Sequence, residues 1–180
     1  MILVCNALRN DLNHPNEYIR GWCLSFLCKI KEPELLEPLV ASVKANLTHR
    51  SVYVRRNAVM TVVNIFKHFE ETLLPDGAEL IVELLTKETD RYTRRNAFLM
   101  LFHAAQDKAV EYLVSNLENL SDFGDGFKLV TLELVRKVCR EDPNQKGLFI
   151  KAIFSMLNSN SAAVSFEAAA TLVRYERAKT

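Results

Sequence analysis

The chain has 180 residues, of which 49% are hydrophobic and 25% charged, the balance of an ordinary folded domain. Its formal net charge is +1, which excludes the strong basic excess of a general nucleic-acid-binding protein, so we expect no nucleic-acid partner. Five glycines and five prolines leave room for few tight turns, which argues against an all-β sandwich.

The first predicted element is a helix over residues 1–12. Its opening MILVC is apolar, has no basic flank and is too short for a signal peptide, so we expect the chain to begin inside a longer protein. At about 100° per residue, one side of this helix carries three apolar residues that we assign to the core: Val4, Leu8 and Leu12.

A second side of the same helix carries Ile2, Cys5, Asn6 and Arg9. Ile2 and Cys5 are apolar where polar residues are expected, and a mixed apolar and polar patch on a rigid helix is typical of a partner site. The alternative is that Ile2 packs under a preceding helix. The sequence alone does not separate these two interpretations.

Further along, the string RRNA occurs at residues 55–58 and again at 94–97, which indicates a repeated unit. The surrounding frame begins with a helix N-cap residue. Counted from that residue, a β-branched residue follows three positions later, often an Arg four positions later and a small residue seven positions later. This frame occurs five times, at spacings of 35, 39, 35 and 36 residues, and its fourth copy is the weakest. The five predicted N-caps are Asn16, Ser51, Asp90, Asp125 and Ser161.

Each N-cap opens a predicted amphipathic helix, such as the one over residues 53–66, whose apolar residues recur at i, i+3 and i+4. A second set of helices lies between them, at residues 35–47, 74–85, 110–120 and 148–157. Three of these have a proline at or shortly before their first turn, where it costs little: Pro33, Pro75 and Pro143. The order is therefore helix, short turn, helix, five times.

A helical hairpin cannot bury its apolar face alone, whereas stacked hairpins can. The frame is similar to the second helix of a HEAT repeat, and Trp22 lacks the context of a tetratricopeptide signature. We predict an all-α fold: an α-solenoid, or α-α superhelix, of about five HEAT-like helical hairpins. The chain is then a single segment, 1–180, with units at approximately 1–31, 32–69, 70–105, 106–140 and 141–180.

The two RRNA strings are equivalent positions in stacked units. We predict that Arg55 and Arg94 reach toward acidic caps or carbonyls of the adjoining turn, and we assign no task to Arg56 and Arg95. This set of arginines either pairs within the chain, which we favour, or binds an acidic partner or anionic lipid.

No catalytic set is evident in the sequence. The histidines are scattered near the repeat period rather than gathered, and we interpret the cysteines as reduced, buried thiols of a cytosolic protein. No phosphate-binding glycine loop or zinc-protease motif occurs. We therefore predict a protein that is not an enzyme, with no cofactor and no metal site. The residues concerned are His14, His49, His68, His103, Cys5, Cys23, Cys28 and Cys139.

The strings NALRNDLNHPNEYIRG (6–21), SVYVRRNAV (51–59) and TRRNAF (93–98) resemble the beta subunits of coatomer, the coat of COPI vesicles. DLNHPNxxIR (11–20) is more broadly similar to the large beta subunits of clathrin adaptor complexes. The resemblance extends over essentially the whole chain, through ELLEPL (34–39) and LVRKVCREDPN (134–144).

This resemblance implies a segment of an adaptin-like trunk in a cytosolic protein that is recruited to Golgi membranes and carries vesicles within the Golgi and back to the endoplasmic reticulum. It implies the other coatomer subunits, especially delta and also gamma, as partners. It also implies a small GTPase of the ADP-ribosylation-factor type in its GTP state. In the related adaptors that GTPase contacts the helix before the Asp-x-x-x-Pro-Asn turn. The positions implied here are Ile2, Cys5 and Asn6, with Arg9 as a further polar contact, and Cys5 replaces a larger apolar residue.

Two other classes remain open. A general HEAT-repeat scaffold, of the nuclear-transport or phosphatase type, binds peptides independently of GTP. A helical-repeat DNA glycosylase needs a basic groove and a catalytic Asp, and the net charge of +1 argues against it.

Overall fold

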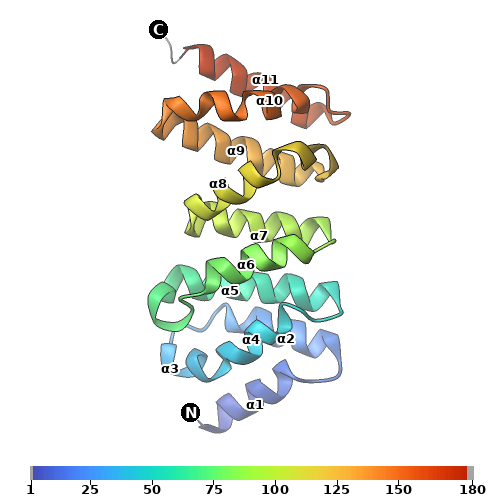
Figure 1. The fold of residues 1–180 in the computed structure, drawn as a ribbon. Coiled ribbons are helices and arrows are strands. Elements are labelled where there is room, and N and C mark those ends of the chain that lie inside the picture. Colours follow the sequence, from blue (N-terminus) through green and yellow to red (C-terminus); the bar gives the residue numbers. More distant parts are fainter. Residues whose placement is uncertain (1, 178–180) are drawn as a thin grey trace. The chain divides into compact units, whose positions relative to one another are not determined.

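The computed structural model describes residues 2–177, without the side chains of residues 70, 71, 176 and 177. The described residues form helices joined by short turns, with no strand among them, and they divide into two compact units, Met1–Gln106 and Asp107–Thr180. Five helical hairpins follow one another along this part of the chain (Figure 1). The all-α solenoid predicted from the sequence is therefore confirmed as the fold class.

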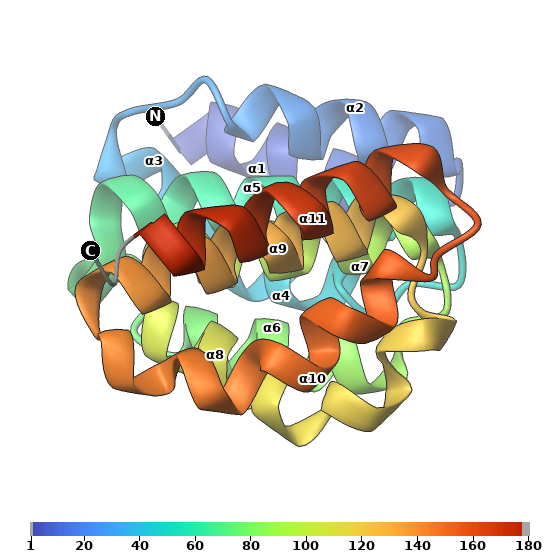
Figure 2. The ribbon, with the colours of Figure 1, turned by 90° about the horizontal axis from the view of Figure 1, so that it is seen from above.

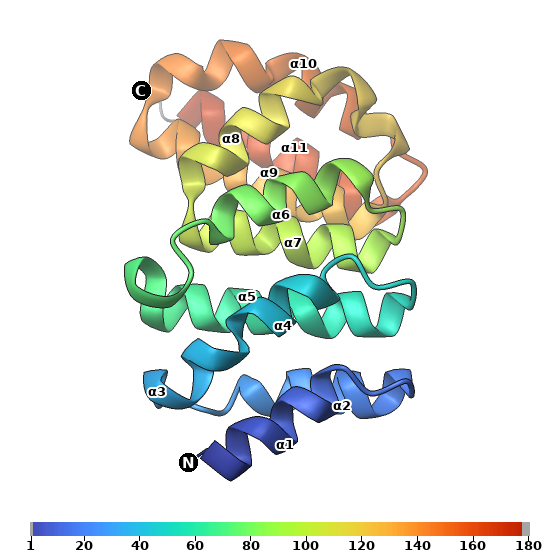
Figure 3. The ribbon, with the colours of Figure 1, turned by 60° about the horizontal axis from the view of Figure 1, so that its bottom comes forward.

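The first unit consists of three hairpins. In each hairpin the second helix packs beside its counterpart in the next, and the first helices lie in front of that layer in Figure 3. The first layer comprises α2 (Glu17–Leu27), α5 (Val52–Leu73) and α7 (Arg91–Ala104). The other layer comprises α1 (Ile2–Leu12), α3 (Pro33–Leu36), the 3-10 turn η1 (Glu37–Leu39), α4 (Val40–Asn46) and α6 (Gly77–Lys87).

The second unit repeats this arrangement with two hairpins, in which α9 and α11 pack against each other and α10 packs against both (Figure 2). Its elements are α8 (Gln106–Ser115), η2 (Leu117–Asp122), α9 (Asp125–Glu141), η3 (Pro143–Gln145), α10 (Lys146–Leu157) and α11 (Ala162–Arg177).

The core is made from the apolar stripes that the repeat frame predicts. The small residue at the seventh position of the frame is fully buried in four repeats, at Cys23, Ala58, Ala97 and Ala168. A small side chain at this position lets neighbouring helices approach closely, because a larger one would have no space to occupy.

The predicted helix over residues 35–47 is not continuous. Pro38 interrupts it, because proline has no N–H to donate and its ring obstructs the preceding turn. The chain therefore passes from α3 through η1 before α4 begins.

Two other boundaries differ from the sequence prediction. α5 continues to Leu73 across a kink at Phe69 (φ −137°, ψ 17°), so the next helix begins at Gly77 rather than near residue 74. In the fourth repeat the N-cap is Gly124 and Asp125 is the first helical residue, so the Asp125 cap prediction was wrong by one position. The predicted repeat boundaries remain a prediction, and residues 1 and 178–180 lie outside the described residues.

Candidate partner-binding surface

In the first unit, the turn before each of α2, α5 and α7 is held by a side chain two positions ahead of the N-cap. The backbone N–H of Asn16 donates to Nδ1 of His14 at 3.0 Å, and that of Ser51 donates to Nδ1 of His49 at 3.0 Å. In the third repeat the N–H of Asp90 donates to a carboxylate oxygen of Glu88 at 2.9 Å. Three different side chains thus satisfy the same otherwise free donor.

His49 acts here as an acceptor, which requires its neutral form. Burial, together with the charges of Arg20 and Arg50, lowers the pKa of His49 below its ordinary value. The ring therefore stays neutral at physiological pH and keeps Nδ1 available. Of the four histidines singled out in the sequence, His14 and His49 thus stabilise turns.

In the first two repeats, the arginine four residues after the N-cap ties the turn to its helix. The Arg20 guanidinium donates to the backbone oxygens of His14 at 2.6 Å and Asn13 at 3.0 Å. The Arg55 guanidinium donates to those of His49 at 2.8 Å and Arg50 at 3.0 Å. The predicted contact of Arg55 with turn carbonyls is confirmed, while that of Arg94 stays a prediction.

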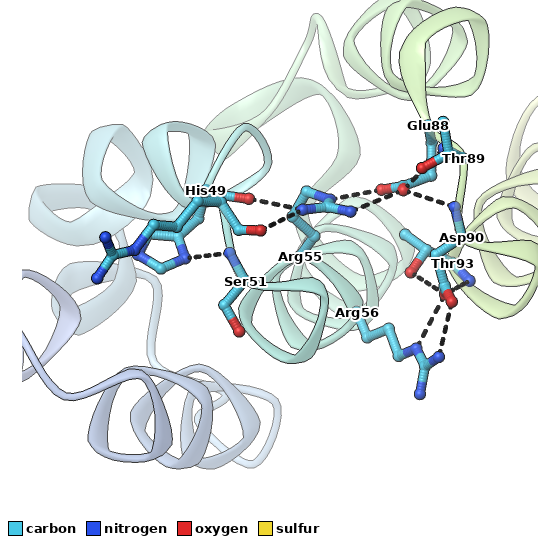
Figure 4. A network of polar contacts seen from close by, with 9 residues as sticks. His49, Ser51, Arg55, Arg56, Glu88, Thr89, Asp90 and Thr93 are labelled. Atoms are coloured by element: carbon cyan, nitrogen blue, oxygen red, sulfur yellow. Dashed lines mark hydrogen bonds and ion pairs between the residues drawn. The ribbon is translucent and has the colours of Figure 1, made fainter.

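Arg55 and Arg56 also bind two carboxylates of the next repeat (Figure 4). Arg55 makes a bidentate pair with Glu88, with N–O distances of 2.6 and 2.9 Å, and the Glu88 side chain is only 2% exposed. Arg56 makes a bidentate pair with Asp90 at 2.8 and 3.0 Å. We assigned no task to Arg56 from the sequence, and the structure places it against Asp90, the N-cap of α7. These two arginines pair within the chain, as the sequence interpretation favoured.

The α1 residues proposed as a partner site do not all share one surface. Ile2 is 79% exposed, and Asn6 and Arg9 are exposed beside it. Cys5 is buried at 8% exposure, whereas Val4 is 52% exposed. We had assigned Val4 to the core and Cys5 to the exposed side, and the structure has them the other way round. The expectation of an exposed Cys5 was wrong because α1 turns Cys5, together with Leu8 and Leu12, toward α2 and α4.

Arg9 is held in place by a backbone contact that the sequence does not reveal. Its guanidinium donates to the carbonyl oxygen of Pro38 at 3.1 Å, which links α1 to the interrupted segment before α4. The exposed part of α1 therefore has an apolar end, formed by Ile2, Leu3 and Val4. The amide of Asn6 and the guanidinium of Arg9 follow it along the helix.

A second exposed surface was missed in the sequence analysis. Tyr18, Trp22 and Phe26 follow one ridge of α2 at intervals of four residues, and Trp22 is 64% exposed. The rings of Trp22 and Phe26 stack with centroids 5.8 Å apart. We call these three residues the aromatic ridge. The i, i+4, i+8 spacing was visible in the sequence, but exposure depends on which neighbouring helices cover the ridge.

Three cysteine thiols, those of Cys23, Cys28 and Cys139, have a pKa shifted away from that of a catalytic nucleophile. Burial, with a smaller effect of Asp11, raises the pKa of Cys23 to about 11. Burial also raises the pKa of Cys28 and Cys139. A nucleophilic cysteine needs the opposite shift.

Among residues 2–177 the structure shows no group of three or more His, Cys, Asp or Glu side chains placed to hold a metal ion. In the same residues, every helix is too short or too polar to cross a bilayer.

The family model of the adaptin N-terminal region matches residues 1–180. The chain belongs to this adaptin family. It is 53% identical to coatomer subunit beta of Dictyostelium discoideum and 51% identical to that of Drosophila melanogaster, in both cases over 180 residues and 100% of the chain. The chain spans about a fifth of these relatives, 20% and 19% of their length. The resemblance to coatomer beta subunits is therefore confirmed.

A solved structure supports the helical-repeat fold of this adaptin-family chain. The crystal structure of an engineered protein aligns with a TM-score of 0.60, covering 94% of the chain and 78% of the engineered protein at 18% identity. At this identity the match concerns the fold alone.

Proposed function

We propose that the chain is a non-enzymatic scaffold segment of the COPI vesicle coat, acting in Golgi-to-endoplasmic-reticulum and intra-Golgi transport. The 53% identity to a coatomer beta subunit over the whole chain supports this role. We further propose that α1 binds the GTP form of a small GTPase of the ADP-ribosylation-factor type. The observation that carries this second step is the exposed apolar end of α1, with Ile2 at 79% exposure beside Asn6 and Arg9.

The proposed contact centres on Ile2. An exposed aliphatic side chain on a rigid helix is suited to insert into an apolar hollow on a partner. Asn6 lies one turn away on the exposed side and supplies both a donor and an acceptor. Arg9, fixed by the Pro38 carbonyl, supplies further N–H donors at the edge.

Cys5 has a different part in this arrangement from the one that we first gave it. Because it is buried, it supports the binding face from below rather than touching the GTPase. A larger residue at this position would push α1 away from α2 and α4 and would tilt Ile2.

Nucleotide dependence would come from the GTPase. Its switch segments are ordered only while the γ-phosphate and magnesium are bound, and α1 would recognise that ordered surface. The chain itself then needs no nucleotide site. Recruitment to the membrane would follow from the lipid-anchored partner, which makes the coat segment cytoplasmic and peripheral on Golgi membranes and COPI vesicles.

Other coatomer subunits, delta and gamma among them, are the further partners that we propose. The aromatic ridge of α2 supports a protein contact on this segment, because exposed Trp and Tyr side chains are enriched at the centres of protein interfaces.

The test is a calorimetric titration of the chain with the GTPase, loaded either with a non-hydrolysable GTP analogue and magnesium or with GDP. We expect binding in the GTP form only. Ile2→Asp should weaken it by about thirtyfold, the equivalent of about 2 kcal/mol. Val173→Asp, which places the same charge at an exposed apolar position of α11, should leave the affinity unchanged.

Two results would contradict the proposal. Equal affinity for both nucleotide states would indicate a general HEAT-repeat scaffold that does not recognise the switch. Unchanged affinity in an Ile2→Asp variant with a native circular dichroism spectrum would remove α1 from the contact.

A further inference from the structure

A groove of about 710 Å³ lies between α5 and α7, within the first unit. It is separate from the exposed part of α1, since it shares no residue with that helix. A volume of this size is in the range that binds ligands or a few side chains of a partner. We call it the α5–α7 groove.

The groove has an apolar floor. Phe66 of α5 and Met100 of α7 are buried beneath it, and Leu99 is half-buried. Met60 is 47% exposed at its edge. Methionine is unbranched and polarizable, so it adapts to different apolar partners without a large cost.

The polar part of the lining contains two cations, Lys67 and Arg95, besides the uncharged Asn96 and the imidazole of His103. Lys67 comes from α5, and Arg95 and His103 come from α7. No Asp or Glu is found among the lining residues of the described chain. The local charge therefore favours an anionic ligand, although the net charge of the chain is only +1.

Arg95 and the equivalent arginine of the preceding repeat, Arg56, differ in their polar contacts. Arg56, at the same position of the frame, is engaged by both oxygens of Asp90. Arg95 makes no ion pair with a described residue, and its guanidinium donates to the amide oxygen of Asn96 at 3.2 Å. Its guanidinium keeps donors for a carboxylate, which arginine binds in a bidentate manner.

We propose that the α5–α7 groove binds an acidic amphipathic peptide segment of a partner protein. Apolar side chains of the peptide lie on Met60, Phe66 and Leu99, while its carboxylates pair with Arg95 and Lys67. The apolar floor favours a peptide over a simple polyanion, because a phosphate cluster gains nothing from burying methionine and phenylalanine. The charge of the lining favours acidic over neutral peptides.

The test uses the full 180-residue chain and three fluorescent ten-residue peptides. In the first, Leu and Phe alternate with Asp and Glu. The second has Ser in place of the acidic residues, and the third has Ser in place of the apolar ones. We expect the first to bind at least about tenfold more tightly than either of the others, in a manner that weakens as salt is added.

Variants locate the binding. Arg95→Glu should weaken the acidic amphipathic peptide by about tenfold or more, and Met60→Ser should weaken it as well. Arg140→Glu is the matched control, since Arg140 is exposed on α9 and outside the groove, and it should leave the affinity unchanged. Circular dichroism checks that each variant is folded.

Each other outcome overturns the proposal. If the neutral peptide binds equally well, the cations have no part in recognition. If the acidic peptide without apolar residues, inositol hexakisphosphate or phosphatidylserine vesicles bind more tightly than the amphipathic peptide, the groove is a polyanion or lipid site. If Arg95→Glu and Arg140→Glu behave alike, binding lies elsewhere on the chain.

Discussion

Arg55 links the second hairpin to the third. Its guanidinium donates to two turn carbonyls of its own repeat and pairs with the nearly fully buried Glu88 of the next repeat. The Glu88 carboxylate also accepts hydrogen bonds from the backbone N–H groups of Thr89 and Asp90. Removing the arginine would leave a buried carboxylate without its counter-charge, which is far more costly than losing an exposed ion pair.

We therefore expect Arg55→Ala to lower the free energy of unfolding by about 3 kcal/mol. Urea titrations followed by far-ultraviolet circular dichroism measure this change. Lys87→Ala is the matched control, because the Lys87–Glu83 pair is solvent-exposed on both sides and contributes little. The reasoning fails if the two variants lose similar amounts of stability.

The Asp90 carboxylate makes stability dependent on acid. The paired Arg56 guanidinium holds the pKa of Asp90 well below its usual range, with help from the N–H and hydroxyl of Thr93 and against the effect of burial. A depressed folded-state pKa stabilises the fold fully above the ordinary carboxyl value of about 4. That stabilisation is lost as the pH falls from there toward the folded-state pKa.

The wild-type chain should accordingly lose up to about 1.4 kcal/mol per pH unit from this group below pH 4. Asp90→Asn keeps an N-cap side chain but not the charge, so it should be less stable at pH 7 and should show a shallower decline. Urea unfolding at pH 7, 4 and 3 measures the slopes. Asp122→Asn, at an exposed position, should follow the wild type. Parallel slopes for wild type and Asp90→Asn would contradict the assignment.

At this scale the sequence predicted roles that depend on local geometry. The N-caps Asn16 and Asp90 and the carbonyl contacts of Arg55 follow from positions within one turn of a helix, so a repeated frame identifies them. The Arg55–Glu88 and Arg56–Asp90 pairs join residues 33 and 34 positions apart. Their pairing depends on how closely α5 and the turn before α7 approach, which no local pattern specifies.

At the scale of single elements, two glycines show how the same substitution depends on its surroundings. A Cβ at Gly77, the first residue of α6, would lie 2.6 Å from the Phe66 ring and 3.0 Å from a Leu74 methyl. Both side chains are buried and have little space to move. A Cβ at Gly147, in the first turn of α10, would meet nothing within 4 Å.

Gly77→Ala should therefore destabilise the chain by about 1 kcal/mol or more, because the clash outweighs the better helix propensity of alanine. Gly147→Ala should stabilise it by about 0.5 kcal/mol, since only the unfolded chain loses freedom. Thermal unfolding of both variants measures the signs. Stabilisation by both would mean that Phe66 moves aside without cost.

The positions of helices were predictable where the apolar periodicity and the N-cap residues agree. They were less predictable where contacts with other helices decide where a helix ends. Pro38 gave a clear signal that the helix over residues 35–47 is interrupted, and our sequence interpretation passed over it. The extension of α5 to Leu73 had no such signal, because the first glycine or proline after it is Pro75. Cys5 and Val4 were exchanged because α1 is short and the 100° period leaves its orientation undetermined until α2 and α4 are placed against it.

At the scale of the whole molecule, the two proposed binding surfaces both belong to the first unit but use different helices. α1 packs against α2 and α4, whereas the α5–α7 groove is formed by the second helices of the second and third hairpins and contains no residue of α1, α2 or α4. Adjacent repeats support one another mainly through nearest-neighbour contacts, so rigid surfaces on separate repeats need not influence each other.

We therefore expect the GTPase and the acidic amphipathic peptide to bind the chain together. With the GTPase at saturation, the dissociation constant of the peptide should change by less than about twofold, and linkage requires the same small change in the reverse titration. Ile2→Asp should abolish only GTPase binding and Arg95→Glu only peptide binding. Loss of both ligands in either folded variant would show that they share one surface. Mutual exclusion without such a loss would show that one ligand extends over both surfaces, and either result would contradict the expectation of independent binding.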